Sequence, residues 1–208
     1  MIGAGVLTLQ EFAMREPLPL ATIQDAVLEF LQEREDAVVT DAQAVNAYVK
    51  EPRMSQDIDL VSTHPAELAQ ELRNYLSDRF HIAVRVRKAG GSGGHRVYQI
   101  RKGGNRHLAD VRHVETLPES RRVANVPVLT PEELIATKVI SYHRRRGQPK
   151  SGTDWRDLAV LLLAFPKLKR PGGPVAQRLR ARTQDPKILA VWAEWAAQEI
   201  QSPRDDDF

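Results

Sequence analysis

The chain has 208 residues, of which 42% are hydrophobic and 27% charged, a balance typical of a folded globular protein rather than a disordered one. It contains no cysteine, which excludes disulfides and thiolate metal sites and fits a cytoplasmic protein. No apolar run approaches the roughly 18 residues that a membrane span needs, so we expect no membrane partner, and the net charge of +3 is modest.

Helix and strand patterns alternate in the first part of the chain. Apolar residues recur at helical spacing between residues 21 and 35, which predicts an amphipathic helix ahead of a strand at residues 37–40. A second helix is predicted from Pro65 to about Asp78, because proline suits a first helical turn and the apolar residues that follow fall on one face.

Asp57 and Asp59 lie in a predicted strand between these two helices. Side chains alternate along a strand, so the two carboxylates point one way while Ile58 and Leu60 point into the core. Acids at this spacing repel each other unless a cation lies between them, and converging oxygen ligands suit Mg²⁺. The alternative is a strand with one solvated face, since acidic side chains are normally exposed.

The residues around this strand resemble the nucleotidyltransferase superfamily and, within it, the AbiEii/AbiGii toxin family. Arg53-Met54-Ser55-Gln56-Asp57-Ile58-Asp59 matches the family's Arg-x-Ser/Thr-x-Asp-x-Asp strand, and residues 43–48 look like the short helix that precedes it. Where the family carries a glycine pair, this chain has Asp41-Ala42. The turn therefore lacks its most permissive residue. If the turn still receives a triphosphate, the carboxylate must point away from it or be balanced by Mg²⁺, Arg53 or Lys138.

The resemblance implies a metal-dependent transfer of a nucleoside monophosphate from an NTP to an acceptor. That acceptor would be the 3′ end of a tRNA, and the protein would be the toxin of a toxin–antitoxin pair with a cognate antitoxin protein. Mg²⁺ would be the cofactor. The nucleotide-binding residues that the resemblance implies are Asp41, Ala42, Arg53, Ser55 and Lys138.

The next segments alternate as strands. Residues 81–87 and 96–101 have a strand period, and the glycine-rich segment 89–94 between them predicts a hairpin loop. This segment lacks the Lys-Ser/Thr ending of a phosphate-binding P-loop and opens into a strand instead of a helix. We therefore expect no phosphate site there.

Asp110 lies in a further predicted strand, at residues 107–114. Alternation places Asp110 on one face with Leu108 and Arg112. The resemblance implies that Asp110 is a third carboxylate of the metal cluster or the base toward the incoming hydroxyl. The alternative is an acid that pairs with Arg112 on a solvated face.

A boundary is predicted at about residues 115–130, which carry two prolines and no strong period. A helix is then predicted from Pro131, because Thr130 and the acids that follow it form a capping box. In the family a lysine of such a helix faces the triphosphate, and Lys138 is similar to it. The alternative is a lysine whose stem lies at the edge of the core.

Asp154 and Asp157 match two acids that the family carries ahead of an apolar helix. For Asp154 we favour a structural role, in which an acid in the first turn of a helix interacts favourably with the helix dipole. For Asp157 we favour a role in orienting Lys138, Arg53 or the active-site base. An ion pair that fixes helix to sheet would look the same in sequence.

Basic residues gather late in the chain, at residues 144–146 and in the proline-containing stretch 167–182, ahead of a last helix at about residues 186–201. Such runs are usually solvated faces, but beside a nucleotide-transfer site they favour contact with an RNA backbone. The six histidines show no paired spacing, so no zinc site is predicted.

These patterns predict an α/β (α+β) fold, with a nucleotidyltransferase-like mixed sheet of about five strands flanked by helices at residues 1–120 and a helical domain at residues 121–208. The function predicted is that of a nucleotidyltransferase. Two alternatives stay open: a family member that has lost catalysis because of Asp41 and serves as a binding or regulatory module, or a nucleic-acid-binding module whose acids only pair with arginines. The candidate catalytic residues are Asp57, Asp59, Asp110, Lys138 and Asp157, and the candidate metal ligands are Asp57, Asp59 and Asp110.

Overall fold

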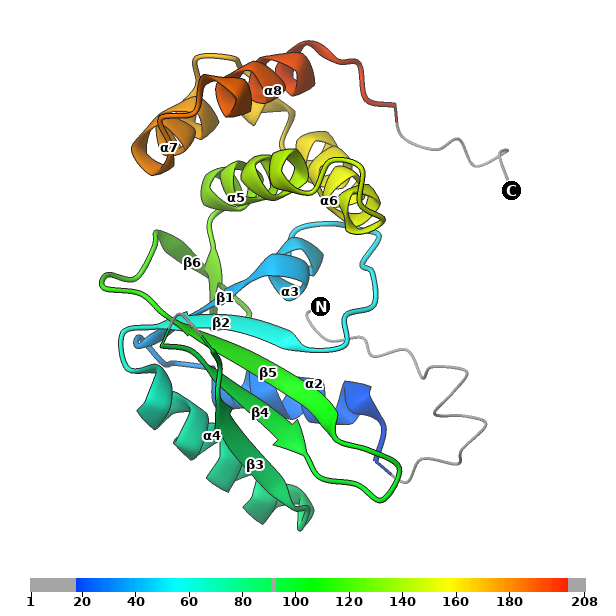
Figure 1. Cartoon of the computed structure of the whole chain (residues 1–208), viewed down its shortest axis with the longest axis vertical. Helices are drawn as coiled ribbons and strands as arrows, with labels where there is room; N and C mark the ends of the chain where they lie inside the picture. Colours follow the sequence, from blue (N-terminus) through cyan, green and yellow to red (C-terminus); the bar gives the residue numbers. More distant parts are fainter. Residues whose placement is uncertain (1–17, 91–92, 202–208) are drawn as a thin grey trace. The chain divides into compact units, whose positions relative to one another are not determined.

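The computed structural model describes residues 18–90 and 93–201 (Figure 1). The described chain forms two compact units. Unit 1 comprises residues 18–47 and 52–129, and it contains the sheet. Unit 2 comprises residues 48–51 and those from 130 onward, and it is helical.

Unit 1 alternates helices and strands along the chain. Its helices are α2 (Leu20–Phe30), α3 (Asp41–Asn46) and α4 (Pro65–Phe80). Its strands are β1 (Ala37–Thr40), β2 (Ile58–Ser62), β3 (Val84–Lys88), β4 (His95–Gln99), β5 (Arg106–His113), β6 (Ser120–Val123) and β7 (Val126–Leu129).

The strands form one mixed sheet in the order β3-β4-β5-β2-β1-β7-β6. Two neighbouring pairs, β2 with β5 and β1 with β7, are parallel, and the remaining pairs are antiparallel. The mixed sheet with flanking helices confirms the predicted fold class.

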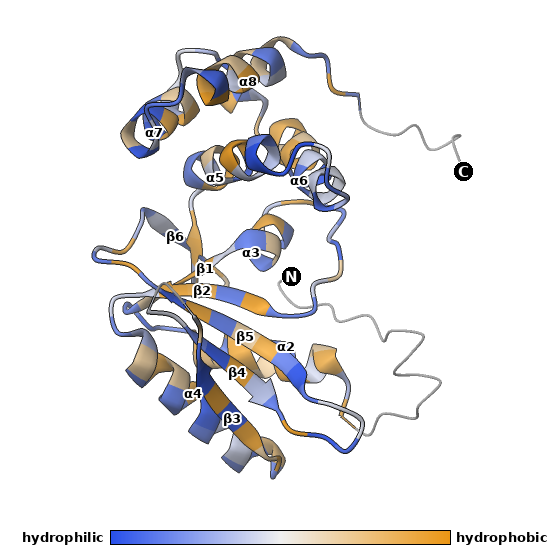
Figure 2. Cartoon of the chain, viewed as in Figure 1, coloured by the Kyte–Doolittle hydropathy of each residue, from blue (hydrophilic) through white to orange (hydrophobic). Residues whose placement is uncertain are grey.

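Helices α2 and α4 pack against each other and against the sheet (Figure 1). Along α4, hydrophobic and hydrophilic residues alternate (Figure 2), as expected of a helix with one buried side. This packing buries one face of the sheet in the core of unit 1. The fully buried side chains of the two helices include Ile23, Val27, Leu68, Leu72 and Leu76.

The hairpin of β6 and β7 is the part of the sheet that the sequence does not predict. Ala124 and Asn125 link the two strands, and both have positive φ angles, of 50° and 64°. Two-residue turns of this kind match the twist of a hairpin. This turn lacks the Asn-Gly sequence from which such a turn is usually predicted. Because β7 pairs with β1, residues 121–129 lie in unit 1, whereas the predicted domains divide at residue 120.

Unit 2 packs its helices around α5 (Pro131–Arg144), which contacts α6 (Lys150–Ala164), α7 (Pro174–Arg182) and α8 (Pro186–Ala197). A short 3-10 helix, η1 (Pro166–Leu168), follows α6. The sequence patterns do not predict α7, although a proline at its first position and a buried apolar side are typical of a helix. In the described part of the chain, no helix has the length and apolar character that crossing a membrane requires.

Candidate active site

The predicted carboxylates lie in one row of paired residues across the sheet. Asp59 on β2 pairs with Asp110 on β5, and Asp110 pairs in turn with Arg96 on β4. Directly paired residues project from the same face of a sheet, so Asp59 and Asp110 share a face, and Arg96 Nε lies 3.1 Å from Asp110 Oδ1. Ile58 and Leu60 are fully buried, as strand alternation predicts.

A β-bulge adds His107 to this face. Val97 pairs with Ala109 and Tyr98 pairs with His107, so Leu108 is an extra residue on β5. An extra residue shifts the alternation of side chains by one position. The imidazole of His107 therefore lies on the side of the carboxylates, whereas strict alternation would place it on the opposite face.

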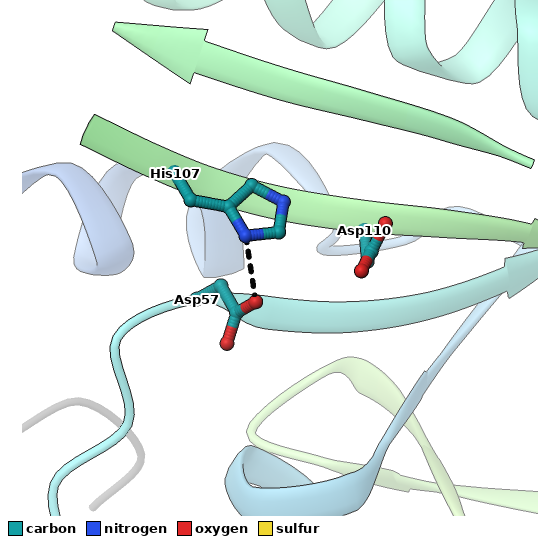
Figure 3. Close-up of side chains that lie close together, drawn as sticks. All are labelled: Asp57, His107 and Asp110. Carbon is teal, nitrogen blue, oxygen red and sulfur yellow. Dashed lines mark ion pairs between the residues drawn. The ribbon is translucent and has the colours of Figure 1, made fainter. Parts of the chain in front are cut away.

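Asp57, His107 and Asp110 converge at this point (Figure 3). One oxygen or nitrogen atom from each of the three residues lies within 4.8 Å of the other two. His107 Nδ1 is 2.9 Å from Asp57 Oδ2, and this hydrogen bond is the main cause that raises the pKa of His107. The two carboxylates and the imidazole form a donor set that fits a divalent cation.

Asp59 lies where several negative charges meet. Burial and the neighbouring Asp41 carboxylate raise the pKa of Asp59 to about 6, with smaller contributions from Asp57 and Asp110, and Arg112 acts in the opposite direction. Arg112 Nη2 is 3.7 Å from Asp59 Oδ1. Carboxylates that crowd in this way favour a bound cation, because a cation stabilises their charged forms.

Asp41 begins α3 with a φ angle of 52°, in the left-handed region that favours glycine. This backbone conformation agrees with the glycine pair that the family carries at the same place. The Asp41 carboxylate accepts a hydrogen bond of 2.9 Å from Arg112 Nη2, which also donates to Thr40 Oγ1 at 3.0 Å. The expected partners of Asp41 were Mg²⁺, Arg53 or Lys138, and the structure adds Arg112 as a balancing cation.

Basic and aromatic side chains continue the same face over β3 and β4. Arg87 pairs with Arg96, and Arg85 pairs with Tyr98. All three arginines are exposed. The Tyr98 ring stacks on the His107 ring with 4.9 Å between centroids, and the Arg87 guanidinium is 6.0 Å from the Tyr98 centroid. The carboxylate row therefore borders an exposed surface of positive charge, formed by Arg85, Arg87 and Arg96 and named here the β3–β4 basic face.

Ser55 and Arg53 belong to the loop that precedes β2. The Ser55 hydroxyl donates to the Asp57 carbonyl at 2.8 Å, and the Ser55 carbonyl accepts from Gln24 Nε2 at 2.8 Å. The Arg53 backbone N–H donates to Asn46 Oδ1 at 2.9 Å. These bonds hold the loop ahead of β2, and nucleotide binding by Arg53, Ser55 and Ala42 stays a prediction.

Lys138 of unit 2 is buried against two acids of α6. Its Nζ atom lies 3.0 Å from Asp157 Oδ2 and 3.7 Å from Asp154 Oδ1, and Arg145 Nη1 lies 3.0 Å from Asp154 Oδ2. The expectation for Asp154 is wrong, because α6 begins at Lys150, so that Asp154 lies beyond its first turn and is buried between cations. Catalytic roles for Lys138 and Asp157 stay predictions.

Several basic residues of the predicted RNA-binding runs form ion pairs with acids. Arg146 Nη2 is 3.2 Å from Glu194 Oε2, and Arg178 Nε is 3.2 Å from Glu133 Oε1. Arg182 also bonds to Glu133. These pairs reduce the positive charge that the C-terminal runs present to a partner.

Sequence reasoning missed His107 and Arg112 as members of the site. The signal for Arg112 was available, because alternation already placed it on the face of Asp110. Alternation did not identify the residue with which Arg112 pairs. That residue is Asp41, which lies at the turn between β1 and α3. His107 had no such signal, because the bulge that reorients it depends on pairing with β4.

Comparisons with solved structures agree with this fold. The Megavirus polyadenylate synthase superposes with a TM-score of 0.60 at 12% sequence identity, covering 76% of this chain and 34% of that chain. This chain therefore spans about a third of the viral protein. The protein JHP933 from Helicobacter pylori superposes with a TM-score of 0.54 at 15% identity, covering 92% of both chains. Identities this low show similarity of fold alone.

A family match covers most of the site and begins directly after Asp41. No curated protein matches the sequence. Residues 42–199, well over half of the chain, match the family described as nucleotidyl transferase AbiEii toxin of type IV toxin–antitoxin systems. The matched region includes the carboxylates of β2 and β5, the bulge at His107 and the buried Lys138. The chain therefore belongs to the AbiEii family of nucleotidyltransferase toxins, as its Arg-x-Ser-x-Asp-x-Asp motif predicted.

Proposed function

We propose that this nucleotidyltransferase moves a nucleoside monophosphate from an NTP to an acceptor hydroxyl at the carboxylate row of unit 1, with a divalent cation held by Asp57, Asp59 and Asp110. The observation that carries the proposal is the pairing of Asp59 on β2 with Asp110 on the parallel strand β5, which places both acids on one face of the sheet, with Asp57 directly before β2. The convergence of Asp57 and Asp110 with His107 supports it further.

In the proposed reaction the acceptor oxygen attacks the α-phosphorus of the NTP. A bond forms between them, the bond from the α-phosphorus to the bridging oxygen breaks, and pyrophosphate leaves. A divalent ion neutralises the charge that develops on the phosphate oxygens when it is bound. Asp110 is the candidate acceptor of the hydroxyl proton, and Arg96, 3.1 Å away, fixes the orientation of the Asp110 carboxylate.

Asp57 and Asp59 are the ligands that we expect to contribute most charge to the ion. They flank Ile58, whose complete burial fixes the strand in one register. The raised pKa of Asp59 supports a cation nearby, because burial and neighbouring acids otherwise disfavour its charged form. Mg²⁺ is the ion that the resemblance implies.

The acceptor that we favour is the 3′ end of a tRNA, with the protein acting in the cytoplasm beside a cognate antitoxin. The tRNA is implied by the family resemblance, and one surface of unit 1 supports a polyanionic acceptor. Arg85 and Arg87 are exposed and share the face of the carboxylate row through their pairing with β4. A phosphate backbone that contacts these arginines would lie close to Asp110.

The test is an incubation with each of the four labelled NTPs, Mg²⁺ and total tRNA. We expect label from at least one NTP to appear on tRNA, and we expect Asp57→Asn to abolish this transfer. The matched control is Asp78→Asn, which changes an exposed acid of α4 outside the site. Labelling of tRNA by the Asp57 variant at the wild-type rate would refute the proposed site.

A nucleic-acid-binding function without catalysis is the second candidate. Two ion pairs favour it, because Arg96 pairs with Asp110 and Arg112 pairs with Asp41, as expected if the acids only balance arginines. The same incubation separates the two functions. Binding of tRNA without transfer from any NTP would favour the binding module over the active enzyme.

A further inference from the structure

We propose that His107 is a nitrogen ligand of the divalent ion and that the site consequently prefers Mn²⁺ to Mg²⁺. The inference rests on the metal dependence proposed above and concerns the choice of ion. It differs from the sequence prediction, which names only carboxylate ligands for this site.

The contact between His107 and Asp57 has the spacing of two adjacent ligands of an octahedral ion, and the 4.8 Å limit for the group with Asp110 is slightly wider than such an ion spans. Ligands at about 2.1 Å from such an ion lie about 3 Å apart when adjacent and about 4.2 Å apart when opposite. The distance from His107 Nδ1 to Asp57 Oδ2 is 2.9 Å, and the donor atoms of the group, including Asp110, lie within 4.8 Å of one another. An ion at this point replaces the proton that the imidazole and the Asp57 carboxylate share.

The position of His107 is fixed by the fold. The bulge at Leu108 turns the imidazole to the carboxylate face, and Leu108 itself is buried, which anchors the bulge in the core. The Tyr98 ring stacks on the imidazole and limits its rotation. Bulges beside active sites commonly redirect one side chain, and here that side chain carries a metal-binding nitrogen.

Asp59 is held by a different partner. It lies outside the group whose donor atoms converge within 4.8 Å, and Arg112 Nη2 is 3.7 Å from its carboxylate. An ion bound by Asp57, His107 and Asp110 therefore leaves Asp59 to complete the coordination or to pair with Arg112. The imidazole of His107 thus lies closer to Asp57 and Asp110 than the carboxylate of Asp59 does.

The donor set determines which ion binds best. Mg²⁺ prefers oxygen ligands and retains its waters, whereas imidazole is a common ligand of the transition metals. Mn²⁺ accepts carboxylate oxygens and an imidazole in octahedral geometry, so one nitrogen ligand favours Mn²⁺ over Mg²⁺. Without His107 the remaining donors are oxygens, and this preference should largely disappear.

The experiment uses the full chain and measures metal binding without any assay of activity. Free Mn²⁺ is counted by electron paramagnetic resonance during a titration, Mg²⁺ is added as a competitor, and nitrogen coupling to bound Mn²⁺ is read by electron spin echo modulation. The variants are His107→Asn, which substitutes an oxygen donor, and His113→Asn, which changes an exposed histidine of the same strand as the control.

We expect nitrogen coupling in the wild type and in His113→Asn, and its loss in His107→Asn. We expect the affinity of His107→Asn for Mn²⁺ to fall by about tenfold or more, with a smaller loss for Mg²⁺. Bound Mn²⁺ without nitrogen coupling in the wild type would overturn the inference and leave the proposed function intact, and this result does not depend on the folding of any variant. If neither ion binds, with or without NTP, the metal dependence of the proposed function fails as well.

Discussion

Arg112 on β5 donates a hydrogen bond of 2.9 Å to the carboxylate of Asp41, the residue that occupies the place of the family's glycine pair. The acid at this turn is therefore paired, although the pairing residue is far away in the sequence. Arg112 is also 3.7 Å from Asp59, so one guanidinium serves two acids of the site. The replacement of glycine at this turn is accompanied by a compensating charge.

The first prediction concerns this turn and the binding of NTP. An uncompensated acid beside a triphosphate would cost on the order of 4 kcal/mol at an effective dielectric constant of about 20. Because Arg112 already balances Asp41, we expect Asp41→Gly to tighten the binding of Mg²⁺-NTP by only about tenfold, or about 1.4 kcal/mol, in calorimetry. The wild type should bind NTP weakly but measurably.

Asp41→Asn is the matched control for this experiment, since asparagine removes the charge and tolerates the positive φ angle of 52°. Equal tightening in both variants identifies charge as the cause, and tightening in Asp41→Gly alone identifies the backbone. If neither variant nor the wild type binds NTP while each binds RNA or metal, the protein has lost its catalytic function.

A second prediction tests the metal ligands by removing charge with little change of shape. Asp57→Asn and Asp59→Asn should lower the rate of transfer by several orders of magnitude. The fold should survive, because neither acid belongs to the apolar core, whereas the neighbouring Ile58 and Leu60 are fully buried and unchanged. Circular dichroism checks the fold and labelled NTP checks transfer. Full activity in either variant would exclude that residue from the site.

The third prediction concerns pH and the stability of the metal-free protein. The pKa of Asp59 is raised from 3.8 to about 6, so protonated Asp59 stabilises the fold. This stability is present below about pH 4, declines as the pH rises and is lost above about pH 6, for a total of at most about 3 kcal/mol. Asp59→Asn should therefore stabilise the protein relative to the wild type more at pH 7.5 than at pH 5, by about 1 kcal/mol.

Urea unfolding in the presence of a chelator measures this difference. Saturating Mg²⁺ or Mn²⁺ should reverse its sign at pH 7.5, because the ion stabilises the charged wild-type site and binds the variant less well. The same difference between wild type and variant at both pH values would show that Asp59 titrates normally.

Much of the fold follows from local periodicity in the sequence. The apolar spacing at residues 21–35 and the proline at residue 65 predict α2 and α4, and the strand patterns predict five of the strands. The hairpin of β6 and β7 escapes prediction because its turn is Ala124-Asn125 and its pairing with β1 is long-range. Helix α7 escapes prediction because its basic residues obscure a short apolar side.

The sequence predicted those site residues whose positions depend on a single strand or on the family motif. Alternation of side chains predicts Asp57 and Asp59 on one face of a strand, and the family resemblance adds Asp110. The positions of His107 and Arg112 depend on how strands pair, since a bulge against β4 turns one and a contact with the turn after β1 holds the other. Neither the bulge nor the contact between Arg112 and Asp41 produces a periodic pattern in the sequence.

The fourth prediction identifies the surface that binds RNA. If the β3–β4 basic face contacts the backbone, Arg85→Ala with Arg87→Ala should reduce the slope of log affinity against log salt by about 2, or about 1 for each phosphate contact. The comparison is Arg144→Ala with Lys167→Ala, which changes two exposed basic residues of the C-terminal runs. A reduction in the second pair alone would assign RNA binding to unit 2, and an affinity independent of salt would exclude a backbone contact.

The fifth prediction separates structure from catalysis at Lys138. Lys138 and Asp157 are almost completely buried and lie 3.0 Å apart, so removing one partner leaves a buried charge without its nearest ion-pair partner. Lys138→Met or Asp157→Leu alone should lower the free energy of unfolding by about 3 to 5 kcal/mol.

The double variant carrying both substitutions should regain most of that stability, because a buried ion pair replaced by apolar side chains is often neutral or stabilising. Asp154 keeps its contact with Arg145 in all of these variants. Denaturation and transfer are then measured on the same preparations. We expect the double variant to be stable, and a loss of transfer by about a hundredfold or more would support the catalytic role predicted for Lys138. A double variant that is both stable and fully active would show that Lys138 and Asp157 serve only the packing of α5 against α6.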